Sequence, residues 1–225
     1  PFFALRLLVG RPWRMIFISF PPSTATAMDT SIRIASRFPA MGTTIFTVMS
    51  RLAAECGAVN LSQGFPDFQA EPALFDAVHR HMTAGHNQYA PMAGTPELRQ
   101  AIVDKVAALY GPRFDAESEV TVTAGATQAI FTAVAAFVRP GDEVIVFAPV
   151  YDSYVPAIET VGGRAVVAHL RFPDYAPDWA EVARLITLKT RMIVINSPHN
   201  PTGSLLTAAD LDQLAKVVRG SDIAI

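Results

Sequence analysis

The sequence predicts an α/β fold of three layers, in which a mostly parallel sheet lies between helices. From about residue 119 to the end of the chain, short β-branched apolar segments alternate with segments of helical periodicity. Such crossovers are right-handed and place helices on both faces of the sheet. Ligands bind these sheets at the carboxyl ends of strands. Three unusual loops are expected at such ends: residues 123–128, 148–154 and 196–203.

The composition of the 225-residue chain excludes several classes of partner. Its hydrophobic fraction of 51% supplies a substantial core, and its net charge of -2 offers no basic surface to nucleic acid or to an anionic membrane. The single cysteine, Cys56, excludes an internal disulfide framework and fits a reducing compartment. We therefore expect a cytoplasmic protein that binds neither nucleic acid nor membrane.

The first 27 residues differ from the rest of the chain, because they are apolar and basic, with no acidic residue before Asp29. Their arginines and Pro12 argue against a membrane-spanning helix, whereas a signal or transit peptide fits such a composition. A third interpretation, which we favour, is an extension upstream of a true start at Met28. Residues 1–27 are then expected to be disordered or not native.

Three helices are predicted in the first half of the chain, over residues 44–56, 71–84 and 95–110. The third begins with Thr95 as its cap and Pro96 at its first position. Turn-rich loops separate these helices, and the stretch NLSQGFPDF contains a sharp bend at Gly64, whose bare backbone could approach a ligand. Two histidines lie two positions apart in the second helix and therefore diverge, so no metal site is expected.

The centre of the chain contains the most informative turn. Residues 120–123 predict a buried strand, Gly125 allows a tight turn, and residues 126–138 are apolar nearly all round, which predicts a buried helix. Free N–H groups and the positive end of that helix suit an anion, most often a phosphate. By itself the segment favours an ordinary strand-to-helix connection with small residues.

The second half of the chain supplies the remaining elements of the sheet. Strands are expected at residues 143–147, 165–170, 192–195 and from 222 onward. Helices are expected in a short segment ending at residue 160, at 179–188 after a cap at Asp178, and after a cap at Thr207.

The three loops at strand ends offer complementary chemistry. The Gly125 turn offers a phosphate cup, Tyr151 an aromatic face for a flat ring, and Asn200 an amide held between two prolines that can bind a ring substituent. Together these groups describe pyridoxal phosphate. A nucleotide would also fit, but the chain lacks a Gly-x-Gly-x-x-Gly fingerprint and a phosphate-loop lysine, and it has no Gly-x-Ser-x-Gly elbow of a hydrolase.

The sequence resembles the class I/II aminotransferases, pyridoxal-phosphate enzymes of fold type I, and among them it is most similar to the methionine and kynurenine (glutamine-type) aminotransferases. Five stretches carry the resemblance in the family's order and spacing: NLSQGFPDF, NQYAPMAGTPELRQAI, TAGATQAIF, PGDEVIVFAPVYDSY and NSPHNPTG. The resemblance covers about residues 37–225. It implies an N-terminal arm and part of the small domain in residues 28–75, and an incomplete large cofactor-binding domain in residues 76–225. Residues 1–27 have no counterpart in it.

The resemblance also implies roles for single residues. The cofactor phosphate would be held by Gly125, Ala126 and Thr127, the pyridine ring would stack on Tyr151, and its phenolic oxygen would bond Asn200. Tyr89 would reach the partner's phosphate across a homodimer interface, and the Gly64 backbone would hold the substrate carboxylate. Without the resemblance, both tyrosines are better interpreted as ordinary half-buried aromatics and Asn200 as a turn former. His199 is assigned no role.

The resemblance further implies a Schiff-base lysine, a ring-nitrogen aspartate and a carboxylate-binding arginine, all expected beyond Ile225. The lysines of this chain, Lys105, Lys189 and Lys216, fit none of these positions. We therefore expect a fragment, inactive alone, of a homodimeric enzyme that transfers an amino group from a neutral or aromatic, methionine-like amino acid to a 2-oxo acid.

Two alternatives remain open at the level of sequence. One is a pyridoxal-phosphate-dependent cysteine-conjugate β-lyase on the same fold. The other is a non-catalytic aminotransferase-like ligand-binding module, as in fused transcription regulators. Such regulators carry a winged-helix domain upstream, and residues 1–29 are too short for one.

Overall fold

A computed structural model describes residues 43–64 and 66–225 of the chain. The described residues fall into two units, divided between Gln63 and Gly64. In the described part of the first unit, helix α1 (Ile45–Glu55) begins after Thr44, whose side chain accepts a hydrogen bond from the Thr47 N–H at 3.3 Å. The helix predicted at 44–56 is thereby confirmed within one residue at each end, whereas the expectations for residues 1–27 lie outside the described residues.

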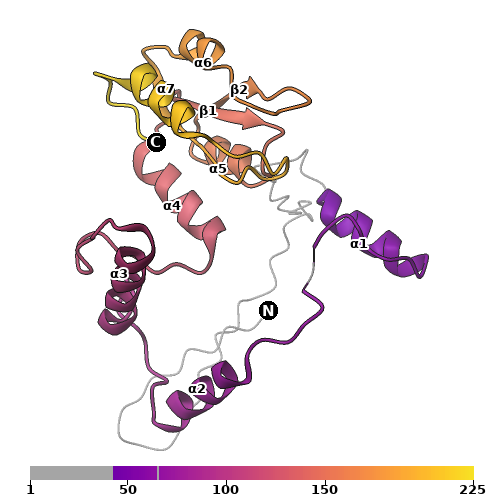
Figure 1. Cartoon of the computed structure of the whole chain (residues 1–225), viewed down its shortest axis with the longest axis vertical. Coiled ribbons are helices and arrows are strands. Elements are labelled where there is room, and N and C mark those ends of the chain that lie inside the picture. Colours follow the sequence, from indigo (N-terminus) through magenta and orange to yellow (C-terminus); the bar gives the residue numbers. More distant parts are fainter. Residues whose placement is uncertain (1–42, 65) are drawn as a thin grey trace, which may run out of the picture. The chain divides into compact units, whose positions relative to one another are not determined.

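The second unit contains the α/β body that the sequence predicts (Figure 1). In chain order its elements are α2 (Pro72–Thr83), α3 (Pro96–Tyr110), α4 (Ala126–Phe137), β1 (Glu143–Ala148), α5 (Tyr154–Thr160), β2 (Arg164–His169), α6 (Trp179–Leu185), β3 (Thr190–Ile193) and α7 (Ala208–Val218). Among the described residues, no helix has both the length and the apolar character needed to cross a membrane.

The sheet of the second unit is parallel, with the strand order β2–β1–β3. Strand β1 pairs in register with β2 from Glu143 opposite Arg164 to Ala148 opposite His169. Its pairing with β3 contains one irregularity beside Glu143. Ala224 forms a parallel bridge to Met192 on the outer side of β3, so the segment expected to begin a strand at residue 222 does join the sheet.

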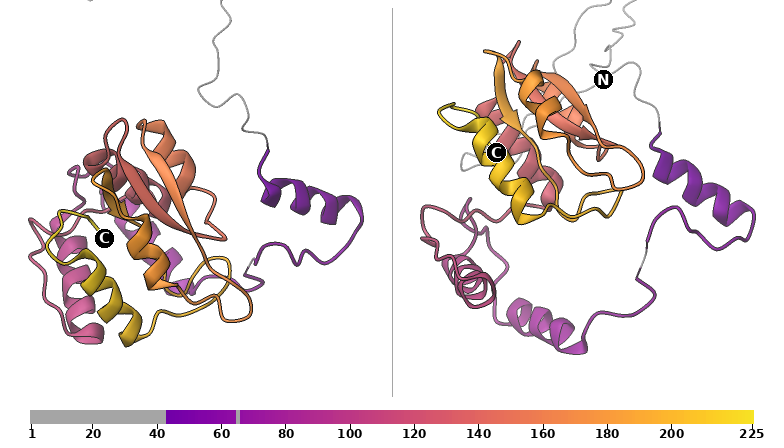
Figure 2. Two further views of the ribbon diagram at one scale, coloured as in Figure 1. Left: turned by 90° about the horizontal axis from the view of Figure 1, so that it is seen from above. Right: turned by 45° about the horizontal axis from the view of Figure 1, so that its top comes forward.

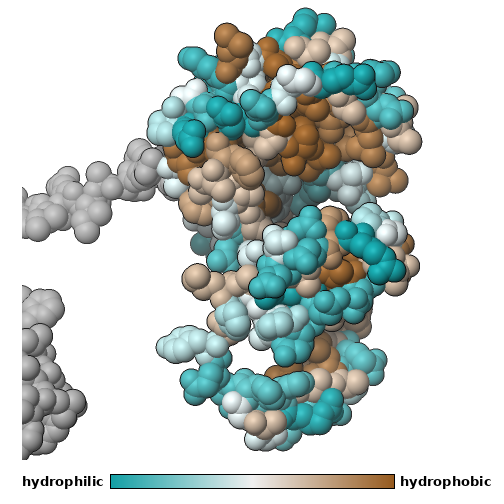
Figure 3. All heavy atoms as spheres, turned by 90° about the vertical axis from the view of Figure 1, so that its left-hand side faces the viewer, coloured by the Kyte–Doolittle hydropathy of each residue, from teal (hydrophilic) through white to brown (hydrophobic). Residues whose placement is uncertain are grey.

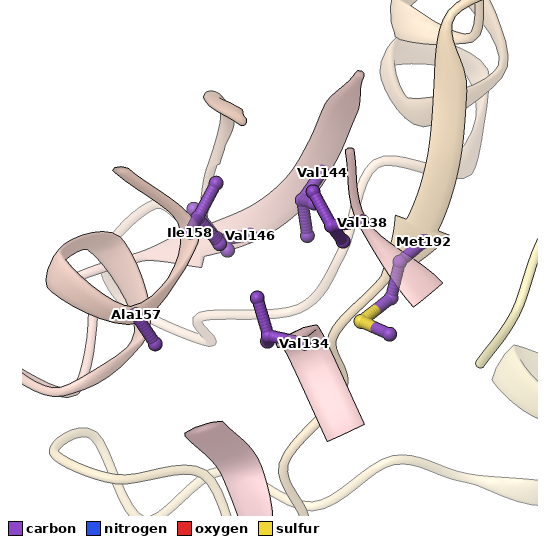
Figure 4. Packing of buried hydrophobic residues seen from close by; sticks show 7 residues of the cluster. All are labelled: Val134, Val138, Val144, Val146, Ala157, Ile158 and Met192. Atoms are coloured by element: carbon purple, nitrogen blue, oxygen red, sulfur yellow. The ribbon is translucent and has the colours of Figure 1, made fainter. Parts of the chain in front are cut away.

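Helices cover both faces of this sheet, because successive side chains of β1 point to opposite sides. On one face, Val144 and Val146 pack with residues of α4, α5 and β3 (Figure 4). On the other face, Ile145 and Phe147 pack with residues of α6, α7, β2 and β3. The strands therefore lie between the α4–α5 pair and the α6–α7 pair (Figure 2), which confirms the predicted three layers.

The predicted strand at residues 120–123 is wrong, because the structure assigns no strand there. A strand requires a neighbouring strand to receive its ladder of hydrogen bonds. The Val122 N–H instead donates to the carbonyl of Ala93 at 2.9 Å, in the turn-rich loop before α3. In the described part of the chain, residues 120–123 therefore bond to the loop before α3 and are not part of the sheet.

The prediction that residues 126–138 form a buried helix is confirmed for the helix and wrong for the burial. Within α4 only Val134 is buried, whereas Phe131 and Phe137 are 41% and 54% exposed. One face of α4 packs on β1 and α5, and the described residues leave its other face exposed. Further apolar side chains are exposed elsewhere on the unit (Figure 3).

Two smaller expectations also change. Helix α6 ends at Leu185, three residues before the predicted end, because Ile186 takes an extended conformation with φ -71° and ψ 129°. Strand β3 covers Thr190–Ile193 and so begins and ends two residues before the predicted strand. The caps predicted at Asp178 and Thr207 are confirmed, since both side chains accept backbone hydrogen bonds at the starts of α6 and α7.

Candidate functional site

The loops that follow β1 and β3 lie at the same edge of the sheet. The two strands are adjacent and parallel, so their carboxyl ends coincide. Helix α4 runs back against β1, because the turn at Gly141 joins them at the amino edge, where the Gly141 N–H donates to the Gly162 carbonyl. At the other end of α4, Ile130 packs on the same cluster as Val150 and Tyr154, which follow β1. The N-terminus of α4 therefore lies at the carboxyl edge of the sheet.

Gly125 determines the backbone conformation at the start of α4. It caps the helix with φ 87° and ψ 171°, a backbone conformation that residues other than glycine rarely adopt. A Cβ at this position would have no atom within 4 Å. The turn is braced from within. The Gly125 N–H donates to the Thr123 carbonyl at 2.8 Å, and the Ala124 N–H donates to Oε1 of Gln128.

The first turn of α4 can receive an anion. Helix geometry leaves the N–H groups of Ala126, Thr127 and Gln128 without intrahelical partners, and no side chain caps this helix. Gly125 adds no atom that would block the approach. Parallel N–H groups at the positive end of a helix favour a phosphate.

Tyr151 lies in the loop after β1 and is half-buried. Its ring meets the ring of Tyr154 edge to face, with centroids 5.5 Å apart and planes at 71°. Tyr154 packs on the core cluster of the α4 face. Burial, followed by the nearby Tyr151, raises the pKa of Tyr154 above its ordinary value. Tyr151 is thus supported on one side by a partly buried ring.

Asn200 lies in the loop after β3, with its side chain exposed. Its amide makes no hydrogen bond to any residue that the structure describes. Its backbone is held, since the Asn200 N–H donates to Oδ1 of Asn196 at 2.6 Å. The peptide bonds before Pro198 and Pro201 are cis. The loop therefore presents an amide with both donor and acceptor free for a ligand.

Two residues of this loop were not predicted from the sequence to belong to the site. Asn196 orients the backbone of Asn200. Its position, four residues before Asn200 and at the end of a predicted strand, could have indicated this role. His199 is buried although the residues on either side of it are exposed. Burial lowers the pKa of His199 below its ordinary value, while a backbone hydrogen bond to Phe147 opposes that shift. No sequence signal distinguished this histidine from a solvent-facing one.

A shallow, mainly apolar hollow lies behind the Asn200 loop. Its lining includes Phe147, Leu170 and Leu206, together with Asn196 and His199. Phe147 and Leu170 belong to the cluster on the α6–α7 face. The hollow therefore lies across the sheet from α4 and does not coincide with the predicted phosphate position.

The structure brings together only part of the predicted site. Gly125, Ala126, Thr127, Tyr151 and Asn200 all lie at the carboxyl edge of the sheet. Tyr89 is fully exposed and Gly64 is exposed, with open space at its Cβ position. The roles of Tyr89 and Gly64 stay predictions.

The lysines lie outside this edge group. Lys105 is exposed on α3, and Lys216 is exposed in the last turn of α7. Lys189 is also exposed and lies at the amino edge, where its carbonyl accepts from the Glu143 N–H. The described residues contain no cluster of side chains suited to a metal ion.

The residues at the carboxyl edge fit pyridoxal phosphate. The uncapped turn of α4 with the open space beside Gly125 suits the phosphate. Tyr151 offers a supported aromatic face. The unengaged amide of Asn200 suits a polar substituent of the ring. The described residues place no lysine amine at this edge of the sheet.

Comparisons with known proteins identify the family of the chain. The family described as aminotransferase class I and II matches residues 57–225. The chain is 47% identical over 190 residues to the methionine aminotransferase of Escherichia coli, covering 84% of this chain and 49% of that protein. It is 42% identical over 193 residues to a probable N-succinyldiaminopimelate aminotransferase of Mycobacterium tuberculosis, covering 84% of this chain and 48% of that protein.

A solved structure shows the same relationship. The crystal structure of YbdL from Escherichia coli, for which a methionine aminotransferase function was identified, matches with a TM-score of 0.81 and 48% identity. The match covers 84% of this chain and 50% of that one. The chain spans about half the length of the curated relatives it matches. By sequence and by structure, the chain belongs to the class I and II aminotransferases and has the α/β architecture of their fold type I.

Proposed function

We propose that the protein carrying this chain is a pyridoxal-phosphate-dependent aminotransferase. It transfers an amino group from a neutral or aromatic amino acid, such as methionine, to a 2-oxo acid. The observation that carries the proposal is the meeting of three groups at one edge of the sheet: the uncapped start of α4, Tyr151 and Asn200. The 47% identity to a methionine aminotransferase supports the choice of donor.

The roles of the edge residues follow from their chemistry. The N–H groups of Ala126 and Thr127, with the open backbone at Gly125, bind the phosphate. The face of Tyr151 stacks on the ring and excludes water from it. The Asn200 amide donates a hydrogen bond to the phenolic oxygen and so orients the ring. When bound, the cofactor supplies an electron sink for the carbon that carries the amino group.

The catalytic lysine is not among Lys105, Lys189 and Lys216. All three are exposed, and Lys189 lies at the opposite edge of the sheet from Asn200. Because transamination needs a lysine amine at the cofactor to carry the proton, residues 28–225 alone do not transaminate. Measurable turnover of methionine and a 2-oxo acid by purified residues 28–225 would refute this part of the proposal.

We propose that the protein forms a homodimer whose two subunits share the active site. We also propose that it is cytoplasmic. Tyr89, fully exposed, then has a surface available to reach the phosphate in the partner subunit. In the same enzyme the Gly64 backbone, with no atom within 4 Å of its Cβ position, can approach the carboxylate of the substrate. The single cysteine of the chain is compatible with a reducing compartment.

The function is tested with the protein that carries this chain, loaded with pyridoxal phosphate. Methionine, an aromatic amino acid and a cysteine conjugate are each supplied with a 2-oxo acid, and the products are identified by mass spectrometry. We expect methionine and the aromatic amino acid to be converted to their 2-oxo acids. The cysteine conjugate should not give the elimination products pyruvate, ammonia and a thiol. Elimination products alone would identify a β-lyase, and cofactor binding without any turnover would identify a ligand-binding module.

A further inference from the structure

His199 is an inward-pointing side chain in an otherwise exposed loop. It is 9% exposed, whereas Ser197, Pro198 and Asn200 are all exposed. A buried imidazole without hydrogen bonds would be costly. Its Nδ1 atom lies 2.8 Å from Oγ1 of Thr202, within hydrogen-bond distance. The ring is therefore engaged in the protein interior directly beside the residue that presents the free amide.

The contact with Thr202 continues to the loop that follows β2. Oγ1 of Thr202 lies 2.9 Å from Oγ of Ser204, and the Ser204 hydroxyl donates to the carbonyl of Tyr175 at 3.3 Å. Thr202 therefore connects the ring to Ser204, whose hydroxyl donates to the Tyr175 carbonyl. The tautomer of His199 sets the direction of the bond between the ring and Thr202. This row of contacts ties the Asn200 loop to Tyr175, in the segment after β2.

The backbone of His199 is fixed as well. Its N–H donates to the Ser204 carbonyl at 2.8 Å, and its carbonyl accepts from the Gly203 N–H at 2.6 Å. The next N–H, that of Asn200, donates to Oδ1 of Asn196 at 2.6 Å. The backbone of Asn200 is thus held by its own N–H and by the residue before it, and the side-chain amide is left free.

We propose that His199 is a positioning residue for Asn200: its buried ring holds the loop so that the Asn200 amide meets the phenolic oxygen of the cofactor ring. The role rests on the proposed function, and His199 does not touch the cofactor. Loss of the ring's hydrogen bond lets the loop move, which weakens only those ligand contacts that Asn200 makes. Contacts of the phosphate with α4 are unaffected.

The test uses 4-deoxypyridoxine 5′-phosphate as the probe, with the protein that carries this chain. This ligand has the phosphate and the phenolic oxygen but no aldehyde, so its binding needs no lysine. We compare His199→Leu, which has similar bulk and no polar atom, with His199→Asn, whose amide can occupy the Nδ1 position. His169→Leu makes the same change at an exposed histidine of β2 and is the matched control.

We expect His199→Leu to weaken the probe about tenfold, the factor that corresponds to 1.4 kcal/mol, while His199→Asn and His169→Leu bind as the wild type does. In an Asn200→Ala background, His199→Leu should have no further effect, because the two residues act on one contact. The absorbance of the bound ring gives a second readout. The hydroxyl titration of the probe should shift toward that of the free ligand in His199→Leu and return in His199→Asn.

Equal weakening by His199→Leu with and without Asn200 overturns the proposal, as does failure of His199→Asn to restore binding and the titration. Thermal unfolding reports whether each variant folds. If His199→Leu does not fold, Thr202→Val replaces it, because it removes the ring's partner and leaves the histidine in place. A wild-type protein that does not bind the probe overturns the proposed function itself, which separates that failure from failure of the coupling between His199 and Asn200.

Discussion

At the residue scale, Gly125 combines a conformational and a functional requirement. Its φ of 87° and ψ of 171° belong to a region that only glycine enters without strain. The same residue leaves open the space in front of the first turn of α4. One backbone position therefore allows the abrupt helix start and the approach of an anion to its N–H groups.

Replacement of this glycine separates conformational cost from steric cost. Because a Cβ at Gly125 meets no atom within 4 Å, Gly125→Ala should lower the free energy of unfolding by about 1–3 kcal/mol through backbone strain alone. It should also weaken binding of 4-deoxypyridoxine 5′-phosphate. Urea unfolding and a binding titration measure the two effects. Gly64→Ala, at another open position without a positive φ, is the control for unfolding, and an equal loss there would contradict the explanation.

At the element scale, the helix that follows the Asn200 loop starts with a capping box. The Thr207 hydroxyl accepts from the Asp210 N–H at 3.2 Å, and Asp210 accepts from the Thr207 N–H at 2.8 Å. Asp210 also accepts from Nε1 of Trp179 in α6 at 2.9 Å. Hydrogen bonds from Thr207 and then from Trp179 lower the pKa of the Asp210 carboxyl. The start of α7 is therefore fixed both locally and to its neighbour helix.

Thr207→Ala removes the side-chain cap of α7 and should lower the free energy of unfolding by about 1 kcal/mol. Thr95→Ala is a matched control, because Thr95 occupies the same position before α3 but makes no capping hydrogen bond through its side chain. Its effect should be no more than about 0.5 kcal/mol. Chemical denaturation followed by circular dichroism measures both variants, and equal losses would rule out the capping box as the cause.

The start of β1 carries a buried carboxylate at the amino edge of the sheet. Glu143 is 5% exposed, forms an ion pair with Arg164 and accepts from the Thr187 hydroxyl at 2.8 Å. These two side chains lower its pKa, Arg164 more than Thr187, against the effect of burial. Glu143 thus joins the starts of β1 and β2 to the turn before β3.

A lowered pKa in the folded state stabilises the protein at pH values above the ordinary pKa of glutamate, and this stabilisation is lost as the pH falls through the lowered value. Glu143→Gln should therefore lower the free energy of unfolding by about 2 kcal/mol near neutral pH, and the difference should shrink in acid. Urea unfolding from about pH 7 to about pH 3 measures the trend. Glu159→Gln, at an exposed carboxylate of α5, should change stability little, and a constant deficit for Glu143→Gln would contradict the linkage.

At the scale of the whole molecule, both faces of the sheet are buried by helices, whereas some of the helices leave apolar side chains exposed. Side chains of β1 supply both core clusters, and residues such as Ile145, Ile158 and Ile193 are fully buried. Apolar side chains of α2, α3 and α4 remain exposed in the described part of the chain. Exposed apolar surface of this kind favours association.

We expect the 225-residue chain produced alone to self-associate through this surface. Phe131→Ser combined with Phe137→Ser should reduce association without lowering the melting temperature, because both side chains are about half exposed on α4. Val134→Ser, on the buried face of the same helix, should instead unfold the chain, because it places a hydroxyl in the core. Light scattering and thermal denaturation distinguish the two outcomes. Unchanged association in the double variant would contradict this explanation.

The candidate site was predictable to the extent that it depends on local chain chemistry. The Gly125 turn, Tyr151 and Asn200 follow apolar segments, and loops in such positions gather at one edge of a parallel sheet. Asn196 and His199 were not predictable as contributors. Their importance comes from hydrogen bonds to Asn200 and Thr202, and the folded loop alone creates those contacts.

By itself, the sequence determined the kinds of element, their order and the loops that carry the chemistry, because turn residues, caps and apolar periodicity act over a few neighbouring positions. The tertiary structure alone decided that the strands lie in the order β2–β1–β3, that residues 120–123 stay outside the sheet, and that α4 buries only one face. Each of these depends on which distant segments come into contact. Pairing and burial are properties of the assembled fold, and no local pattern of residues encodes them.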